Sequence, residues 1–533
     1  MAIEFPEYSR RWQRTILAAY LAAFLLGVPG WWSLTRVQRS SLPKHDVFAA
    51  GEARTVAVPF AYRIGSDAQC LLAGAQPLKV AAPALQADLI AEIDRILPHA
   101  HVSLVRYPDW TLRIEPHVHA ENDAVENVPI LCHAEGKERR VVFNKNAILI
   151  SGSASLEYAT RLAHATVHLA QLAANAQESI PFSREYEILA SLFIEDPAAV
   201  SSLGYRSTWS VGPSALEKYI RPFVDALFPT RANGTSPVHL ASQVRYFVQP
   251  GEGVLTETDQ NATEVRIPRD RLPHLVGSDW PVAPSAAAPH RSVVHLVTYV
   301  PATPMVVLDG DDVESATPSP FNDFVVPRWG GVVVHNMRDQ ATRPQEMIVP
   351  LGDERKLAET WITHLRDAFG VRRVQGSVQI DTTTLSFPDA GTVTGISATE
   401  RAVYHLSSAV THTVETIQTL QALVRLVDQQ TNLPVSPTIA REVQTALRGV
   451  TSRPTAAWSD MHARARAARA QAEAAFFDPD MVGLMYFPDE HKYAVYMPLF
   501  VPVLVTVLSV VVRELRVWQK ERKVCIVPVQ RAA

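Results

Sequence analysis

The sequence contains very little cysteine, with only Cys70, Cys132 and Cys525 among its 533 residues. A disulfide-rich scaffold needs more cysteines and a CxxC zinc site needs a closely spaced pair, so both are excluded. Cys525 follows a cationic segment near the C-terminus and is expected to stay reduced in the cytosol. Cys70 and Cys132 could form a disulfide if they lie in an oxidising compartment, but the sequence does not fix their geometry. Their pairing is therefore left open.

A strong net charge is also missing. The formal net charge of -4 is too small to indicate a nucleic-acid partner. An apolar content of 47% instead favours packed globular structure over disorder. The length of 533 residues leaves room for two to three domains of ordinary size.

The common catalytic motifs are absent from the sequence. It has no GxSxG elbow, no Walker loop, no GxGxxG after a predicted strand and no cysteine in protease-like surroundings. Cys132 precedes His133, but a nucleophile and its base are paired in space rather than in sequence. His164 and His168 have the i, i+4 spacing of helical metal ligands, but neither an HExxH motif nor a third ligand accompanies them. The sequence therefore predicts no catalytic, cofactor or metal site.

Two long uncharged runs are present, at residues 15–34 and 493–512. A helix of twenty residues spans about 30 Å, which is the thickness of the hydrocarbon core of a bilayer. We therefore predict two transmembrane helices. Pro498 and Pro502 lie one turn apart in the second run, which indicates either a proline-tolerant start of the helix or a kinked helix that packs on partner helices.

The cations around these runs predict the topology. Residues 513–523 contain five cations, whereas Lys492 alone stands just before the second run. The positive-inside rule places residues 513–533 in the cytosol, and two spans then place residues 1–14 there too. The first run could also be a cleaved signal peptide, but its length and the bulky residues Trp31 and Trp32 favour an uncleaved anchor. Residues 35–492 are then lumenal.

Two glycosylation sequons support this assignment. They begin at Asn233 and Asn261, and both fall within residues 35–492 in polar, turn-like stretches. No sequon falls outside that segment. Either sequon alone is a weak signal, but their common placement agrees with a lumenal domain.

Residues 85–395 read as an α/β section, a mixed sheet with flanking helices and at least partly parallel pairing. Apolar periodicity predicts its elements. The expected helices are residues 85–97, 153–174, 213–228 and 353–369, and the expected strands are residues 102–106, 111–114, 140–150, 186–194, 238–248, 292–300, 305–308 and 332–336.

Residues 397–477 read as a helical section. Apolar residues recur every three or four positions up to about residue 432, and two further helices are expected at residues 436–448 and 456–476. The third is rich in alanine and carries Arg464, Arg466 and Arg469. We interpret these arginines as a solvated face, with contact to an acidic partner or to lipid headgroups as the alternative.

Two short segments have both an ordinary and a functional interpretation. Gly330 and Gly331 follow Trp329, which is typical of a bulge or the start of a strand, with a binding platform as the alternative. Residues 309–312 read DGDD and invite a calcium interpretation. Val313 breaks the ligand alternation of an EF-hand, so a solvated hairpin turn is favoured.

Several separate segments together resemble the PIG-S family of GPI transamidase subunits, from the first apolar run to the second and in the same order. Residues 44–185 show little of this resemblance. The segments that carry it are GVPGWW at residues 27–32, SLP at 41–43, PRWGG at 327–331, FFDP at 476–479, YFPD at 486–489 and YMPLF at 496–500, with residues 186–197 and 219–227 in addition.

The resemblance implies a non-catalytic structural subunit in the endoplasmic-reticulum membrane, with both termini cytosolic and a large lumenal domain. A complex of this kind removes a C-terminal signal from a proprotein and joins the new carboxyl end to a GPI lipid. The implied partners are a caspase-like catalytic subunit of the PIG-K type, PIG-T, PIG-U and Gaa-type subunits, and membrane lipid. No cofactor is implied, and no family substrate-binding residue can be matched position by position.

The alternative is an independent hydrolase or transferase tethered in the lumen by the two spans. Its site would have to be built from residues such as His133, His164 and His168, for which the resemblance offers no interpretation. Activity of the isolated lumenal segment would favour this alternative. A stable requirement for partner subunits would favour the structural subunit.

Overall fold

The computed structural model divides the chain into two compact units, and each is described by itself. The larger consists of Ala49–Gln418 and Ala446–Ala470, and the smaller of Met1–Phe48, Thr419–Thr445 and Gln471–Ala533. Gaps interrupt the described residues of both units. The structure describes residues 15, 18, 19, 22, 26, 27, 29, 39–120, 129–134, 139–144, 147–175, 178–202, 205, 206, 209, 211–228, 235–251, 263–277, 280, 291–311, 316–337, 347, 348, 354–387, 394–430, 433–452, 457–479, 481 and 489–524.

The larger unit contains a first mixed sheet, whose described strands lie in the order β18-β19-β6-β7-β5-β1-β4-β3, with β2 paired to β5. β1 pairs in parallel with β4 from Thr55 to Arg63, but with β5 only at Arg63 and Ile64. The strands are β1 (Thr55–Ile64), β2 (Gln76–Pro77), β3 (His101–Ser103), β4 (Thr111–His119), β5 (Ile130–His133), β6 (Arg140–Asn144), β7 (Ala147–Ile150), β18 (Gly376–Ile380) and β19 (Thr383–Phe387).

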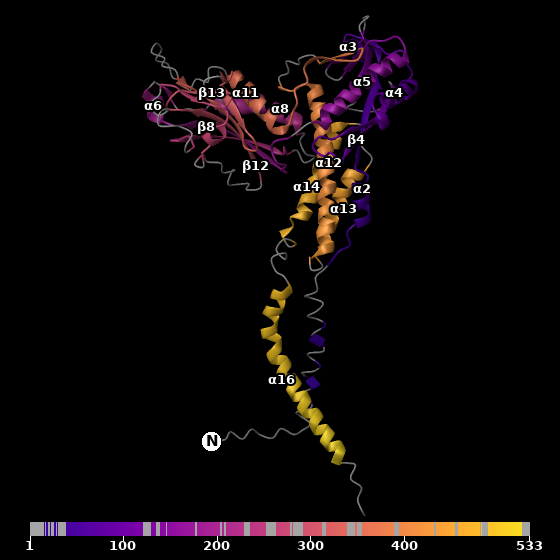
Figure 1. Cartoon of the computed structure of the whole chain (residues 1–533), viewed down its shortest axis with the longest axis vertical. Coiled ribbons are helices and arrows are strands. Elements are labelled where there is room, and N and C mark those ends of the chain that lie inside the picture. The colour runs from indigo at the N-terminus through magenta and orange to yellow at the C-terminus, as the bar shows by residue number, and fades with distance from the viewer. Residues whose placement is uncertain are drawn as a thin grey trace, which may run out of the picture. The chain divides into compact units, whose positions relative to one another are not determined.

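Two helices, α4 (Ala82–Ile96) and α5 (Ser155–Ala174), pack on this sheet and share its core (Figure 1). Leu85, Leu89 and Ile93 of α4 are almost fully buried and form its apolar stripe, whereas Ile90, which the sequence pattern also placed on that face, is exposed. Short helices η1 (Pro98–Ala100) and α3 (Asp67–Leu72) complete this part. A capping box in which Ser66 and Gln69 bond each other's backbone N–H groups begins α3.

A second sheet in the larger unit has the order β10-β8-β12-β16-β15. β8 (Tyr186–Ile194) pairs in parallel with both β10 (Val238–Tyr246) and β12 (Ser292–Val300), and β12 pairs in parallel with β16 (Gly330–Val334). β15 (Asp323–Val326) closes this order as an antiparallel strand. Every residue of β8 is buried, which explains why its sequence is apolar on both faces, apart from the buried polar residues Glu187 and Ser191, rather than an alternation.

Both faces of this second sheet are covered. One face packs on α7 (Val211–Ala215), a π-helical turn η2 (Leu216–Ile220), α8 (Arg221–Leu227) and α11 (Glu354–Phe369). The other packs on β11 (Val265–Ile267), β13 (Met305–Asp309), α10 (Leu272–Leu275) and the side chain of Trp280. The remaining short elements of the described chain are β14 (Thr317–Pro318), α6 (Pro197–Ser202), β9 (Tyr205–Arg206) and β17 (Met347–Ile348).

Three sequence predictions differ from this fold. Residues 140–150 form two antiparallel strands, β6 and β7, instead of one, because the apolar run hides a reversal after Asn144. The α/β section begins at β1, well before residue 85; large apolar residues alternate along β1, but Pro59 within the run argues against a strand. The predicted helix 213–228 contains a π-helical turn that ends where Pro222, which lacks an N–H donor, enters α8.

The two short segments with double interpretations are ordinary in the structure. A Cβ on Gly330 would lie 2.0 Å from the carbonyl oxygen of His295, and one on Gly331 would lie 2.0 Å from Nδ1 of His364. These glycines therefore let β16 approach β12 and α11 closely. Asp309 ends β13 and pairs with Thr317 of antiparallel β14, and no group of side chains suited to a metal ion occurs among the described residues.

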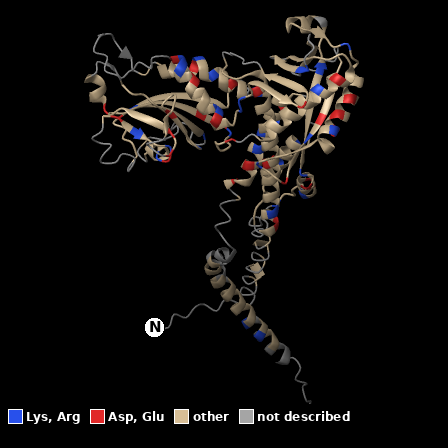
Figure 2. Ribbon diagram, turned by 45° about the horizontal axis from the view of Figure 1, so that its top comes forward, with Lys and Arg blue, Asp and Glu red and all other residues tan. Residues whose placement is uncertain are grey.

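The predicted helical section is confirmed as α12 (Ala398–Gln429), α13 (Pro437–Thr451) and α14 (Trp458–Phe476). Basic and acidic residues are interspersed along the helices of the α/β sections (Figure 2), as the small net charge of -4 leads one to expect. In the smaller unit, Nη2 of Arg39 donates to the carbonyl oxygen of Val427 at 2.5 Å, and Lys44 forms an ion pair with Asp428.

The smaller unit also contains α16 (Asp489–Val524), which includes Pro498 and Pro502 and covers the second predicted span. Val501, Val505 and Leu508 are among its exposed apolar side chains. The first predicted span, residues 15–34, falls mostly outside the described residues. Within the part of the chain that the structure describes, no helix meets the combined requirement of length and apolar character for crossing a membrane.

Candidate functional site

The residues that the sequence singled out do not form a common site in the structure. Asn233 and Asn261 lie outside the described residues, as do Asp312 and Asp353. Cys70 and Cys132 are joined by a disulfide bond with their Cα atoms 5.6 Å apart, which resolves the pairing that the sequence left open. A disulfide sulfur is no thiolate, so Cys132 is unavailable as a nucleophile beside His133.

The three histidines of the alternative enzyme hypothesis make separate packing contacts. Nδ1 of His133 lies 3.0 Å from the hydroxyl oxygen of Tyr158. His164 is buried on α5, where its Nδ1 lies 3.1 Å from Oγ1 of Thr383, and burial lowers its pKa. The ring of His168 lies 6.0 Å from that of Phe387. His164 and His168 thus hold α5 against β19.

The prediction of a solvated face is wrong for Arg466 and Arg469 of α14, whereas Arg464 is partly exposed and bonds an exposed residue. Arg466 and Arg469 extend into a group of aromatic, histidine and acidic side chains in the larger unit, and Arg464 donates to Oγ of Ser452 at 3.2 Å. We call this group the junction cluster. Its members are Tyr107, Glu178, Phe182, Tyr186, Phe228, Tyr404, His405, Ser408, His412, Glu415, His462, Arg466 and Arg469.

Arg466 is the aromatic-bound cation of the junction cluster. Its guanidinium carbon lies 5.2 Å, 5.3 Å and 5.1 Å from the ring centroids of Phe182, Tyr186 and Phe228, respectively. One guanidinium nitrogen also donates to the carbonyl oxygen of Ser183 at 2.6 Å. A planar guanidinium suits such a site because it can stack on rings while its N–H groups donate in its own plane.

Arg469 is the ion-paired cation of the junction cluster. It pairs with Glu415 of α12, and both side chains are largely buried, at 14% and 15% exposure. Its guanidinium lies 4.1 Å from the ring centroid of Phe182. Glu415 also accepts a hydrogen bond from the hydroxyl of Tyr107, whose pKa is raised by burial and by that carboxylate. The pair thereby connects α14 and α12 with the loop that follows β3.

Three histidines lie behind the two arginines. Nδ1 of His405 is 2.9 Å from Nδ1 of His462, and the rings of His412 and His462 stack with centroids 5.7 Å apart. Burial lowers the pKa of His405 to about 4 and holds those of His412 and His462 well below their usual value, with the nearby arginines adding to the effect. All three are therefore neutral at pH 7.

The arrangement is suited to holding segments together rather than to chemistry. Each cation has a ring or a carboxylate as its partner, and the carboxyl group of Glu178, whose pKa is raised by burial, accepts a hydrogen bond from Ser408 at 3.0 Å. The junction cluster joins the loop after β3, the segment before β8, the end of α8, and helices α12 and α14. Sequence reasoning missed it, although Arg466 and Arg469 share a helix face with His462.

Comparisons with known proteins agree over nearly the whole chain. A family model described as "Phosphatidylinositol-glycan biosynthesis class S protein" matches residues 18–521. The chain is 25% identical to a mouse protein named "GPI-anchor transamidase component PIGS", over 96% of each chain. A human protein of the same name is 25% identical over 96% of this chain and 97% of its own. A fission yeast protein named "GPI transamidase component PIG-S homolog" is 23% identical over 97% of this chain and 86% of its own.

Proposed function

Because the chain belongs to the phosphatidylinositol-glycan biosynthesis class S family, we propose that it is a structural, non-catalytic subunit of a GPI transamidase. The observation that carries the proposal is the match over residues 18–521. The named relatives are components of the GPI transamidase, and they align with 96% or more of this chain. Such end-to-end similarity covers both α/β sections and the helical section, so it does not come from a shared module alone.

The internal contacts support a structural role. In the junction cluster, the titratable groups that an enzyme could use contact one another: Arg469 pairs with Glu415, and His405 lies against His462. Histidines with strongly lowered pKa values stay neutral and pack as rings. The subunit would hold a catalytic subunit of the caspase-like PIG-K type in register with PIG-T, PIG-U and Gaa-type subunits.

We further propose the endoplasmic-reticulum membrane as its location. Residues 15–34 and 493–512 are the uncharged runs that would anchor it, and the cations of residues 513–523 would keep the C-terminus in the cytosol. The Cys70–Cys132 disulfide and the sequons at Asn233 and Asn261 suit a lumenal position for the part between the runs. Protease protection in sealed microsomes, combined with an endoglycosidase shift, tests this topology.

The test of the function is purification of the tagged full-length chain in mild detergent, followed by mass spectrometry. We expect a caspase-like subunit and several multi-spanning subunits in amounts comparable to the tagged chain. A matched purification of the catalytically inactivated complex should contain the same subunits, because assembly does not require turnover. Recovery of the chain alone would contradict the proposal.

The alternative hydrolase or transferase makes an opposite prediction. An independent enzyme would be active as the isolated lumenal segment, and if His133 and His164 formed a site that GPI attachment requires, their replacement by alanine would abolish attachment while the complex still assembled. We expect instead that His133→Ala leaves attachment unchanged, because the ring of His133 makes a packing contact with Tyr158 within this chain. Surface display of a GPI-anchored reporter in cells that lack the endogenous subunit measures the difference.

A further inference from the structure

Strand β1 has one free edge. Its pairing with β5 is restricted to Arg63 and Ile64, so the described strands leave one side of residues 55–62 without a neighbour. The direction of the backbone groups follows from two hydrogen bonds. The N–H of Thr111 in β4 donates to the carbonyl oxygen of Arg54, whereas the N–H of Arg63 donates to the carbonyl oxygen of Pro129, before β5. The backbone N–H and C=O groups of successive residues point to opposite sides of a strand, so those of Thr55 and Ala57 point toward the free edge.

Part of this edge is already protected. Pro59 points the same way as Ala57 but has no N–H to offer, and its carbonyl oxygen accepts from Nε1 of Trp458 at 2.7 Å. Proline and a covering side chain are devices by which proteins block edge strands. Neither device reaches Thr55 and Ala57, and the described residues provide no backbone partner for these two on the free side.

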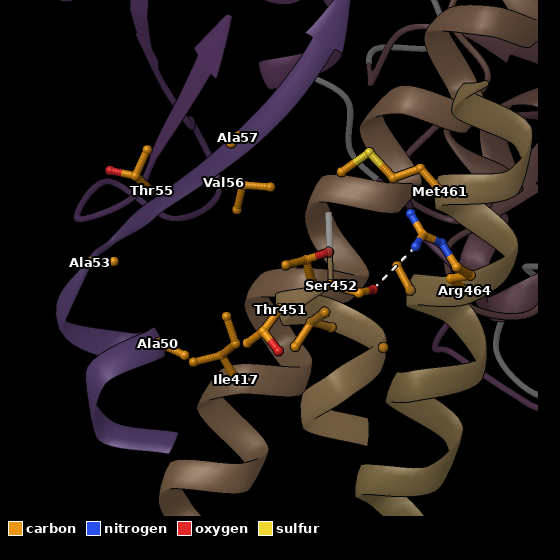
Figure 3. A pocket seen from close by; sticks show the side chains of 14 residues that line it. Ala50, Ala53, Thr55, Val56, Ala57, Ile417, Thr451, Ser452, Met461 and Arg464 are labelled. Carbon is orange, nitrogen blue, oxygen red and sulfur yellow. Dashed lines mark hydrogen bonds between the residues drawn. The ribbon is translucent and has the colours of Figure 1, made fainter. Parts of the chain in front are cut away.

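A cavity of about 280 Å³ lies beside this open part of the edge. Figure 3 shows β1 on one side of it and the helices α12, α13 and α14 on the other. The cavity is near the lower end of the size range of ligand pockets, so it accommodates a short segment rather than a large molecule. Its wall consists mainly of small side chains, with a polar rim from Thr451, Ser452 and Arg464.

We propose that a short extended segment of another subunit of the complex lies in this cavity and continues the first sheet along β1. Its backbone would bond the N–H and C=O groups of Thr55 and Ala57, which is the way that extended peptides add to a sheet edge. Small side chains are required on this segment, because its backbone and side chains together must fit within about 280 Å³ between Ala53, Gly449 and Ala465. This inference rests on the proposed function, since it takes the occupant from the transamidase.

A photo-crosslinking residue at Ala53 tests the occupant. Ala53 is exposed and lines the cavity, so a reactive side chain there reaches the proposed segment without disturbing the core. In the purified wild-type complex, we expect one crosslinked product that joins this chain to a second subunit, with the attachment mapped to a few adjacent residues. A product with only detergent, lipid or the proprotein, or no product, would overturn the inference.

The matched variants are Ala57→Pro and Ala57→Ser. Proline removes only the N–H that points to the free edge, and Pro59 shows that β1 accepts proline in this orientation. Serine keeps the N–H at a similar size. Loss of one backbone hydrogen bond should lower the crosslink yield about two- to tenfold for Ala57→Pro, whereas Ala57→Ser should match the wild type. Equal yields for the two variants would refute strand addition.

Two controls keep the result interpretable. If Ala57→Pro does not fold, as judged by thermal unfolding, Ala53→Trp replaces it, because an indole would fill the cavity from its exposed side. The crosslinker is then placed at Thr451 on the opposite wall, and an unchanged yield would again refute the inference. A wild-type preparation that lacks all other subunits refutes the proposed function instead, whereas a complete complex without a crosslink refutes only the docking.

Discussion

Two faces of helix α14 differ in what surrounds the same kind of residue. On one face, Arg466 and Arg469 are held among rings and a carboxylate in the junction cluster. On the other, Met461, Arg464 and Ala465 border the cavity beside β1. Both faces contain arginines set among alanines, so the sequence of the helix does not by itself decide the role of each arginine. The segments that pack against each face decide it.

The largest loss of stability is expected from breaking the ion pair between Arg469 and Glu415 in the junction cluster. Arg469→Ala leaves the largely buried carboxylate of Glu415 with Arg106, 3.2 Å away, as its remaining cation, and the loss should be about 3 kcal/mol, the lower end of the cost of breaking a buried pair. Urea unfolding of the purified full-length chain, followed by tryptophan fluorescence, measures this loss. The double variant Arg469→Met with Glu415→Gln should recover part of it. A change below about 0.5 kcal/mol in the free energy of unfolding of the single variant would show that the junction cluster does not depend on this ion pair.

Acid should destabilise the packing of α14 in the junction cluster and leave the face of α14 that borders the cavity unaffected. His405 is neutral in the folded protein because burial lowers its pKa to about 4, whereas the unfolded chain takes up the proton near pH 6.5. The contribution of His405 to the free energy of unfolding is therefore fully present above about pH 6.5 and is lost as the pH falls from there toward 4. The loss is on the order of 3 kcal/mol.

The measurement is the urea midpoint between pH 7.5 and 4.5 for the wild type and for His405→Asn. Because carboxylates titrate in the same range, the difference between the two proteins is the relevant quantity, and the variant should show the shallower dependence. His117→Asn, at an exposed position on β4, serves as the control and should follow the wild type. Parallel curves for His405→Asn and the wild type would contradict the prediction.

A pair of conservative substitutions compares the two faces directly. Arg466→Lys replaces a planar group that touches three rings with a compact ammonium, which should cost about 1–2 kcal/mol. Arg464→Lys changes the same residue type two positions earlier and should cost about 0.5 kcal/mol or less. The same unfolding assay applies to both. Equal costs would mean that position on the helix, rather than the surrounding segments, sets the role of each arginine.

Much of the fold follows from the sequence, for a physical reason. β8 and β12 are largely buried on both faces, so predominantly apolar runs mark them, and both strands have the predicted bounds. The stripe of α4 and the three C-terminal helices follow from the period of 3.6 residues. β1 was missed although large apolar residues alternate along it, because Pro59 in its middle argues against a strand.

The junction cluster was not predictable in the same way. Its contacts join residues far apart in sequence, such as Tyr107 with Glu415 and Phe182 with Arg466. An arginine in an alanine-rich helix carries no local signal that distinguishes a solvated face from a ring-bound cation. The free edge of β1 likewise depends on where β5 begins to pair, which no pattern within β1 records.

The smallest effect on stability is expected at the rim of the cavity. Ser452→Ala removes the hydroxyl that accepts from Nη1 of Arg464 at 3.2 Å, a bond between exposed groups. The free energy of unfolding should change by about 0.5 kcal/mol or less, because both groups regain water when the bond is lost. Without this bond Arg464 can turn into the cavity and compete with the proposed segment for space. The crosslink yield from Ala53 should therefore fall even though stability hardly changes. A destabilisation above about 1 kcal/mol would instead show that the rim is tightly packed, because an exposed hydrogen bond at the edge of a cavity contributes less than this.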